Sequence, residues 1–379
     1  MLISIAVLTI AVVLFVLFVY NKCYTQHSKT KLYCKDNLIK NALLRITPAI
    51  KEDFVPTFWA NSSFLQTWMR TLIRIIHTNE LVTKRQYVEM RDDGITSLDF
   101  IYRDEVISDN ETKPILVIIP SVLNTHRKSY TQLCNLAISN GYRPIVFNKR
   151  GYSKTPLSHL SSLSSESDFD DTFAYISKKY PFSDLYVIAY SMEATNFVNC
   201  LYEYDPCPRI LGVVCISATF GCENFTKNLS IKEPYNRLLT EKLKSIYLQH
   251  SVVKESFNYN LIQSCKAVDE LQKQISKPGY KLYRPIPKTN TFFTPVLFIN
   301  SVDDPVVPVQ CLPYSIVSKL DNCFLLTTEK GGHCGFYEGF VPLCWAEKIA
   351  LNFFEKAANN KKLFSSTMHG SRSRSATCY

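Results

Sequence analysis

Residues 185–200 read LYVIAYSMEATNFVNC, and this stretch decides the fold. LYVIA is a continuous apolar run with the length of a strand that is buried on both faces. It leads directly into Tyr190-Ser191-Met192-Glu193, after which the apolar spacing becomes that of a helix. A serine on a sharp turn between a buried strand and a helix is the setting of a nucleophile elbow. The alternative is a serine that caps the helix N-terminus.

Five further apolar runs resemble LYVIA and are predicted strands. They are Ile115–Ile119, Pro144–Asn148, Ile210–Ile216, Val296–Asn300 and Cys323–Thr328. Helical patterns lie between some of them, at Ser129–Asn140 and Asp168–Tyr180. This alternation predicts an α/β fold with a mostly parallel sheet and helices on both faces. The gap before Pro295 is too long for one crossover, so we expect residues 222–294 to form a helical cap inserted into the sheet's connections.

Chain order favours Ser191 as a nucleophile rather than a cap. In an α/β hydrolase an acid and then a histidine follow the serine, each just past a strand. Here Asp303 and Asp304 follow one predicted strand, and Gly331-Gly332-His333 follows the next. We prefer Asp304 as the acid because a proline follows it and holds its backbone extended, which leaves Asp303 to cap or to face solvent. The predicted triad is Ser191, Asp304 and His333, in which the acid orients the imidazole.

Two backbone N–H groups are the expected donors to an oxyanion. One belongs to Met192, at the start of the helix after the serine. The other lies near Val122 or Leu123, in the loop after the strand Ile115–Ile119.

The usual G-x-S-x-G pattern is altered, because Ala189 and Glu193 replace both glycines. A Glu193 carboxylate directed inward would compete with the oxyanion for N–H groups. Directed away, it would sit near a helix N-terminus, where negative charge is favourable. In either geometry we expect Glu193→Gly not to lower the rate of hydrolysis.

Composition indicates a folded, membrane-facing protein. Of 379 residues, 46% are hydrophobic and 20% charged, so most of the chain can bury a core, and the net charge of +10 suits an anionic membrane surface. No zinc-finger spacing, RNA-binding aromatic run or dense basic helix indicates nucleic acid. The thirteen cysteines form no CxxC pair, which argues against a metal site and a tight disulfide framework. No cofactor is implied, and the sequence does not indicate an oligomeric state.

The N-terminal residues 1–20 read MLISIAVLTIAVVLFVLFVY, without a charged side chain. Twenty such residues span a hydrocarbon core as a helix, and the features of a cleaved signal peptide are missing, so we expect a transmembrane anchor. Residues 21–54 are a mixed, basic connector, and residues 361–379 are an expected disordered tail. The lysines after residue 20 would keep the body in the cytoplasm, whereas glycosylation sequons at Asn61, Asn110, Asn224 and Asn228 favour the opposite side.

Several separated stretches resemble the membrane-anchored lipases and esterases of AB hydrolase family four. They are Phe54-Val55-Pro56-Thr57-Phe58-Trp59, Leu65-Gln66-Thr67, Asp92-Asp93-Gly94 with Leu98-Asp99, the Pro120 loop, Phe147-Asn148-Lys149-Arg150-Gly151, Ser191, Ala267-Val268-Asp269-Glu270, Asp303-Asp304-Pro305 and Gly332-His333. The resemblance covers about residues 50–355 and implies an α/β-hydrolase domain over 55–360. It also implies the same triad and a single-pass, type II location in the endoplasmic reticulum or another endomembrane.

The resemblance implies hydrolysis of acyl esters in lipids, of the acylglycerol or phospholipid class. The chain departs from the family's pattern at Ser121, where glycine is usual, and at Ala189 and Glu193. Glu193 could cost about 2–4 kcal/mol of transition-state stabilisation, comparable to one lost oxyanion donor. Two hypotheses follow. One is a serine hydrolase acting on lipid esters; the other is a catalytically impaired relative that binds lipid or a protein partner at the membrane.

Overall fold

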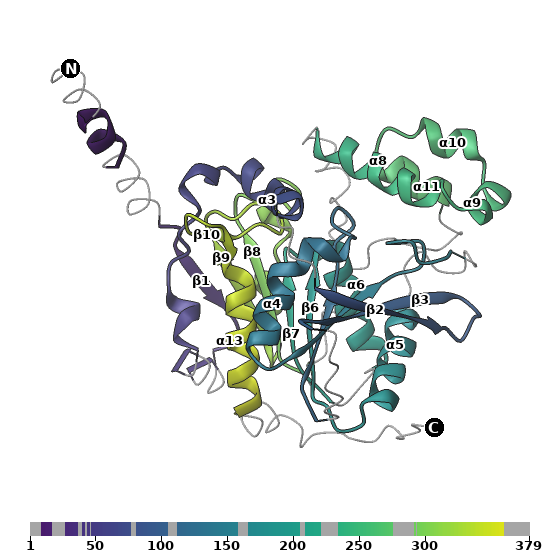
Figure 1. Ribbon diagram of the computed structural model, residues 1–379, viewed down its shortest axis with the longest axis horizontal. Coiled ribbons are helices and arrows are strands. Elements are labelled where there is room, and N and C mark those ends of the chain that lie inside the picture. The colour runs from purple at the N-terminus through teal and green to yellow at the C-terminus, as the bar shows by residue number, and fades with distance from the viewer. Residues whose placement is uncertain are drawn as a thin grey trace.

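A nine-stranded, mostly parallel sheet organises the protein (Figure 1). The computed structural model describes residues 9–16, 27–36, 40–41, 44–45, 47–76, 81–104, 112–157, 166–204, 209–220, 234–275, 292 and 294–359. The strands are β1 (Thr30–Tyr33), β2 (Val82–Glu89), β3 (Ile95–Tyr102), β4 (Ile115–Ile119), β5 (Arg143–Asn148), β6 (Leu185–Tyr190), β7 (Ile210–Ile216), β8 (Val296–Ser301) and β9 (Cys323–Thr328). Their order is β1-β9-β8-β7-β6-β4-β5-β3-β2.

Neighbours from β5 through β4 to β9 run parallel, and β1, β2 and β3 add antiparallel edges. This order confirms the predicted α/β-hydrolase fold. All six predicted strands are present, with bounds within one residue of those expected. These strands could be predicted from the sequence because β4 to β9 are buried almost throughout. Strands buried on both faces require uninterrupted apolar runs.

The sheet's edges were not predicted. β2 is a half-exposed edge strand whose sequence, VTKRQYVE, carries solvated charges. β3 contains the buried carboxylate of Asp99, which accepts two bonds from the Arg85 guanidinium of β2 at 2.6 and 2.8 Å. β1 lies inside the expected connector 21–54 and pairs with β9. Each of these strands interrupts its apolar pattern with charges that only the neighbouring strand explains.

Helices cover both faces of the sheet. On one face α4 (Thr131–Ser139), α13 (Trp345–Asn359) and part of α3 (Ser63–Ile76) pack into one hydrophobic cluster; on the other, α5 (Glu166–Lys179) and α6 (Ser191–Tyr204) pack into a second. The remaining short elements are η1 (Pro48–Lys51), η2 (Phe58–Ala60), η3 (Arg127–Tyr130), η4 (Val309–Cys311), α12 (Tyr314–Val317), β10 (Tyr337–Glu338) and β11 (Leu343–Cys344).

The predicted insertion contains four described helices, which Figure 1 shows grouped together. They are α8 (Tyr235–Tyr247), α9 (Ser251–Ser256), α10 (Tyr259–Ser264) and α11 (Val268–Ile275). Their apolar side chains form a third cluster that includes Val122 and Met192, next to Ser191. The insertion is therefore packed onto the loops that surround the predicted nucleophile.

The described part of the predicted anchor, residues 9–16, is helical. No helix within the described ranges is both long and apolar enough to cross a membrane. The remainder of the predicted anchor and the predicted disordered tail lie outside the described residues.

Candidate active site

Ser191 occupies the turn between β6 and α6 with a positive φ of 58°. The left-handed region is unfavourable for a residue with a side chain, so this backbone holds strain. Strain at a serine between a buried strand and a helix is the geometry predicted from residues 185–200. A helix-capping serine would have extended backbone angles instead.

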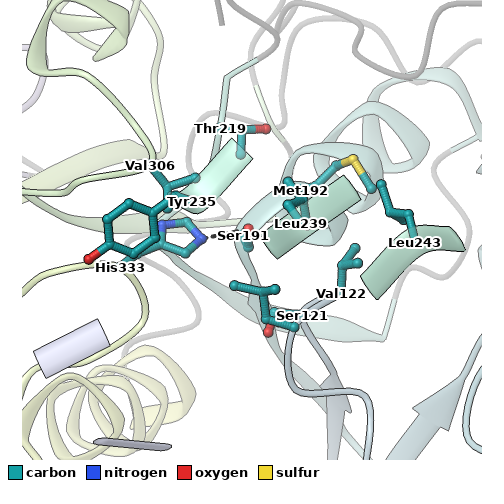
Figure 2. A pocket seen from close by; sticks show the side chains of 11 residues that line it. Ser121, Val122, Ser191, Met192, Thr219, Tyr235, Leu239, Leu243, Val306 and His333 are labelled. Carbon is teal, nitrogen blue, oxygen red and sulfur yellow. Dashed lines mark hydrogen bonds between the residues drawn. The ribbon is translucent and has the colours of Figure 1, made fainter. Parts of the chain in front are cut away.

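The structure brings the three predicted triad residues together. Ser191 Oγ lies 2.8 Å from His333 Nε2, a contact drawn in Figure 2, and His333 Nδ1 lies 2.9 Å from Asp304 Oδ2. The second carboxylate oxygen of Asp304 accepts the N–H groups of Val306 and Val307 at 2.7 and 2.8 Å. The acid is thus fixed at one oxygen and faces the imidazole with the other.

Asp303 has a different role from its neighbour. Its Oδ1 accepts the N–H of Gly332 at 2.9 Å, so it holds the loop that carries His333. Burial raises the pKa of the Asp303 carboxyl, and the bond from Gly332 acts in the opposite direction. The geometry agrees with the preference for Asp304 as the residue that contacts the imidazole.

The two glycines before His333 allow its loop to approach α3. Gly332 has a φ of 61°, and a Cβ there would lie 2.4 Å from the backbone oxygen of Ser63. The close approach lets Thr67 Oγ1 accept the His333 N–H at 2.9 Å. We had no sequence-based reason to give Thr67 this role beyond its place in the family resemblance.

The Asp304 carboxylate sets the proton affinity of His333. Burial alone lowers the pKa of the imidazole, but Asp304 and Cys334 together more than offset burial and raise that pKa well above its ordinary value of 6.5. A carboxylate in this position favours the protonated imidazole.

The expected oxyanion donors line the same pocket as Ser191. Met192 stands at the start of α6, where backbone N–H groups lack an acceptor within the helix. In the opposite loop the N–H of Ser121 donates to Tyr130 Oη at 3.0 Å, which leaves Val122 and Leu123 as that loop's candidate donors. Sequence alone could not choose between these two residues, and the backbone geometry leaves both.

Glu193 points away from the oxyanion donors. Its carboxylate is buried and lies 3.1 Å from Lys149 Nζ, while its second oxygen accepts a bond from Asn196 at 3.2 Å. Burial lowers the pKa of Lys149, but Glu193, Tyr247 and Asp168 together outweigh burial and raise that pKa. This pair changes our expectation for Glu193→Gly, because removing the carboxylate leaves a buried ammonium without its partner.

The pocket above Ser191 is mostly apolar. The pocket is partly open to solvent, and α8 covers it with Tyr235, Leu239 and Leu243 (Figure 2). Val122, Met192 and Val306 complete the apolar wall. Within the described ranges there is no group of His, Cys, Asp and Glu side chains that could hold a metal ion. The arrangement suits a reaction at a carbonyl carbon with an apolar group attached.

The chain is similar to several abhydrolase-domain proteins. Human Protein ABHD15 is 24% identical over 345 residues, covering 85% of this chain and 73% of its own. Bovine Phospholipase ABHD3 is 27% identical over 318 residues (78% and 76%), and bovine Monoacylglycerol lipase ABHD2 is 24% identical over 389 residues (91% and 90%). No family model matches the chain.

Asp304→Asn is expected to lower kcat/KM for ester hydrolysis by about 10³–10⁴-fold, because an amide facing Nδ1 holds the wrong imidazole tautomer. Asp303→Asn is the matched control: its amide oxygen can still accept the Gly332 N–H, so we expect less than about a tenfold change. Steady-state kinetics on a soluble ester measures both variants. A larger loss of kcat/KM in Asp303→Asn than in Asp304→Asn contradicts the assignment of Asp304 as the acid.

For the wild type, kcat/KM should rise with pH through an apparent pKa above 6.5, since His333 acts as a base only when unprotonated.

Glu193→Gln is expected to lower the free energy of unfolding by about 3–5 kcal/mol, because it leaves the Lys149 charge buried and unpaired. Lys149→Met should lower the free energy of unfolding by a similar amount, because it leaves the Glu193 carboxylate buried without its cationic partner. The double variant carries neither charge, so we expect it to be more stable than either single variant. Urea unfolding of the detergent-solubilised protein, followed by tryptophan fluorescence, gives all three values. Strictly additive losses would show that the two side chains do not stabilise each other.

Proposed function

We propose that the chain is a member of the AB hydrolase superfamily, as its similarity to abhydrolase-domain proteins supports, and that it is a serine hydrolase that cleaves carboxylic acyl esters of lipids. The observation that carries this proposal is the hydrogen-bonded relay from Ser191 through His333 to Asp304 at the base of an apolar pocket. Two relatives are named as a phospholipase and a monoacylglycerol lipase, which supports acylglycerols or phospholipids as the substrate class.

In the proposed mechanism Ser191 Oγ attacks the ester carbonyl while His333 Nε2 takes its proton. The N–H group of Met192, with that of Val122 or Leu123, stabilises the negative oxygen of the tetrahedral intermediate. His333 then gives the proton to the leaving alcohol, and the acyl group stays on Ser191. Water attacks this acyl-enzyme with His333 again as the base, and the fatty acid leaves as Ser191 regains its proton. Asp304 keeps the imidazole oriented throughout.

The cap supports an apolar substrate and a need for movement. Ser191 and His333 are almost fully buried beneath α8, so a lipid must displace this helix to reach them. We propose that the cap, residues 222–294, acts as a lid that exposes Leu239 and Leu243 to the acyl chain when it opens.

The alternative is a catalytically impaired relative that binds lipid or a protein partner at the membrane. The observation in its favour is Glu193, because a charged side chain stands where the turn usually has glycine. The bonds that Glu193 makes to Lys149 and Asn196 favour the enzyme, since they direct its charge away from the pocket.

A fluorophosphonate probe is expected to label the wild type and not Ser191→Ala, because only an activated serine hydroxyl attacks the phosphorus. Purified protein should also release fatty acid from a monoacylglycerol, and Ser191→Ala should lose this activity. Fatty acid release from a phospholipid, measured in parallel, ranks the two lipid classes. Indistinguishable labelling and hydrolysis for the wild type and Ser191→Ala on every ester would favour the impaired alternative.

We further propose that residues 1–20 anchor the protein in a membrane, with an uncharged apolar run of spanning length as the support. Carbonate extraction should leave the full-length protein in the membrane pellet. Leu14→Lys/Phe15→Lys should shift it towards the supernatant, since each lysine at a helix centre costs roughly 2.5–3.5 kcal/mol on insertion. Complete release of the wild type would contradict an anchor.

A further inference from the structure

The helix α3 carries apolar side chains on its exposed face as well as on its buried face. The buried face combines the polar side chains of Gln66, Thr67 and Arg70 with the apolar Met69 and Ile73. Its exposed face carries the apolar side chains Phe64, Leu65, Leu72, Ile75 and Ile76, and the last two are 68% and 71% exposed. Surface helices normally turn their apolar stripe inward and their charges outward.

The polar side chains on the buried face of α3 each bond another part of the fold. Gln66 bonds the backbone of Ala60 at 2.8 Å and both the N–H and the C=O of Tyr337, at 2.7 and 3.0 Å. Thr67 holds His333, and Arg70 contacts Glu347 at 2.8 Å. On the outer face Phe64 packs on Trp68 and Tyr235, whereas Ile75 and Ile76 stay largely exposed. Apolar surface of this kind marks an interaction site.

Neighbouring segments extend this apolar surface. Trp59 of η2 is exposed and donates from Nε1 to the backbone oxygen of Phe340 at 3.3 Å. Phe340 stacks on Phe58 and is, with Val341, among the most exposed apolar side chains that the structure describes. We call this surface the α3 patch and define it by Trp59, Phe64, Leu65, Leu72, Ile75, Ile76, Phe340 and Val341.

The α3 patch borders the pocket that holds Ser191. The ring of Phe64 meets that of Tyr235 edge to face, with centroids 6.3 Å apart. Tyr235 in turn lines the pocket, and Figure 2 shows it beside His333. A ligand that lies on the α3 patch is thus next to the rim of the cavity.

The chain enters the described body beside the same patch. Ser28 pairs with Phe54 through two backbone bonds and accepts the Lys330 N–H. Lys330 Nζ reaches Asn61, the residue after η2, at 2.8 Å. Only residues 21–27 separate Ser28 from the apolar run 1–20, so they can span at most about 25 Å.

Charge near this entry point favours one occupant. Lys29 and Lys31 follow the buried Ser28 and are exposed. Basic residues close to a membrane surface attract anionic headgroups, and aromatic side chains such as Trp59 favour the interface. A short tether, flanking lysines and an aromatic apolar surface together suit a bilayer rather than a soluble protein.

We propose that the α3 patch lies on the surface of the bilayer that holds residues 1–20, with the rim of the pocket facing the lipid. This proposal rests on the proposed function for its anchor and its lipid substrate. It adds that a lipid passes between the membrane and Ser191 along Phe64 and Tyr235, without crossing water.

The three tryptophans provide a direct test in the full chain. Trp59 is exposed and belongs to the α3 patch, Trp68 is half-buried, and Trp345 is buried in the core. The full-length protein is reconstituted into phosphatidylcholine–phosphatidylserine vesicles whose acyl chains are brominated near the headgroup, and tryptophan quenching is recorded. We expect marked quenching that Trp59→Phe reduces.

Ile75→Asp and Phe182→Asp are matched variants, because the two native side chains are 68% and 69% exposed and only Ile75 is on the α3 patch. Ile75→Asp should reduce quenching and lower hydrolysis of monoacylglycerol in vesicles by roughly tenfold, the effect of losing one buried aliphatic side chain. Hydrolysis of a soluble p-nitrophenyl ester should stay unchanged in both variants, and Phe182→Asp should match the wild type on vesicles.

Quenching is independent of activity, so an inactive protein that is quenched would refute the proposed function and leave the docking surface standing. Absence of quenching, or equal behaviour of the two variants on vesicles, would overturn the docking surface while soluble-ester hydrolysis still supports the enzyme. A dimer that Ile75→Asp dissociates without any change in quenching would assign the patch to a second copy and also overturn it.

Discussion

The buried Arg70 guanidinium connects most of the structures on which the site depends. It contacts Glu347 of α13 at 2.8 Å and lies over the rings of Tyr130 and Tyr190, 5.0 and 4.6 Å from their centroids. Tyr190 precedes Ser191 and donates to the same Glu347, while Tyr130 accepts the N–H of Ser121 in the oxyanion loop. One cation, charged at every accessible pH, thereby fixes the position of both sides of the oxyanion site relative to each other.

A second buried ion pair explains how the turn accepts a glutamate. Glu193 is in the first turn of α6, where the helix dipole favours a carboxylate. Lys149 then neutralises it from the end of β5, so little net negative charge reaches the pocket. Replacing both members of a buried ion pair by apolar groups often leaves the free energy of unfolding unchanged, whereas removing one member lowers it strongly. The two residues must therefore change together, and a glycine at position 193 alone would not restore the usual turn.

The sequence predicted what is local or fixed by chain order. Strands buried on both faces appear as apolar runs, and the order of Ser191, Asp304 and His333 follows from the fold, so both were readable. The partner of Glu193 could not be predicted from the sequence, because Lys149 is 44 residues away and nothing in the sequence around it indicates that this lysine is buried. β2 was missed for a related reason: Arg85 reads as a solvated charge until Asp99 is placed opposite it. Pairings across the sheet depend on contacts that no sequence window contains.

The polar residues on the buried face of α3 belong to the same buried network. Arg70 and Thr67 must face inward to reach Glu347 and His333, and the period of a helix then puts Phe64, Leu72 and Ile75 on the opposite face. Charged residues on that outer face would make α3 an ordinary solvated helix, and nothing in the active site prevents them. Because the buried contacts do not require the outer face to be apolar, its apolar residues need a separate cause. Contact with lipid supplies one, and it gives a single helix two functions: one face holds the catalytic loop and the other meets the source of the substrate.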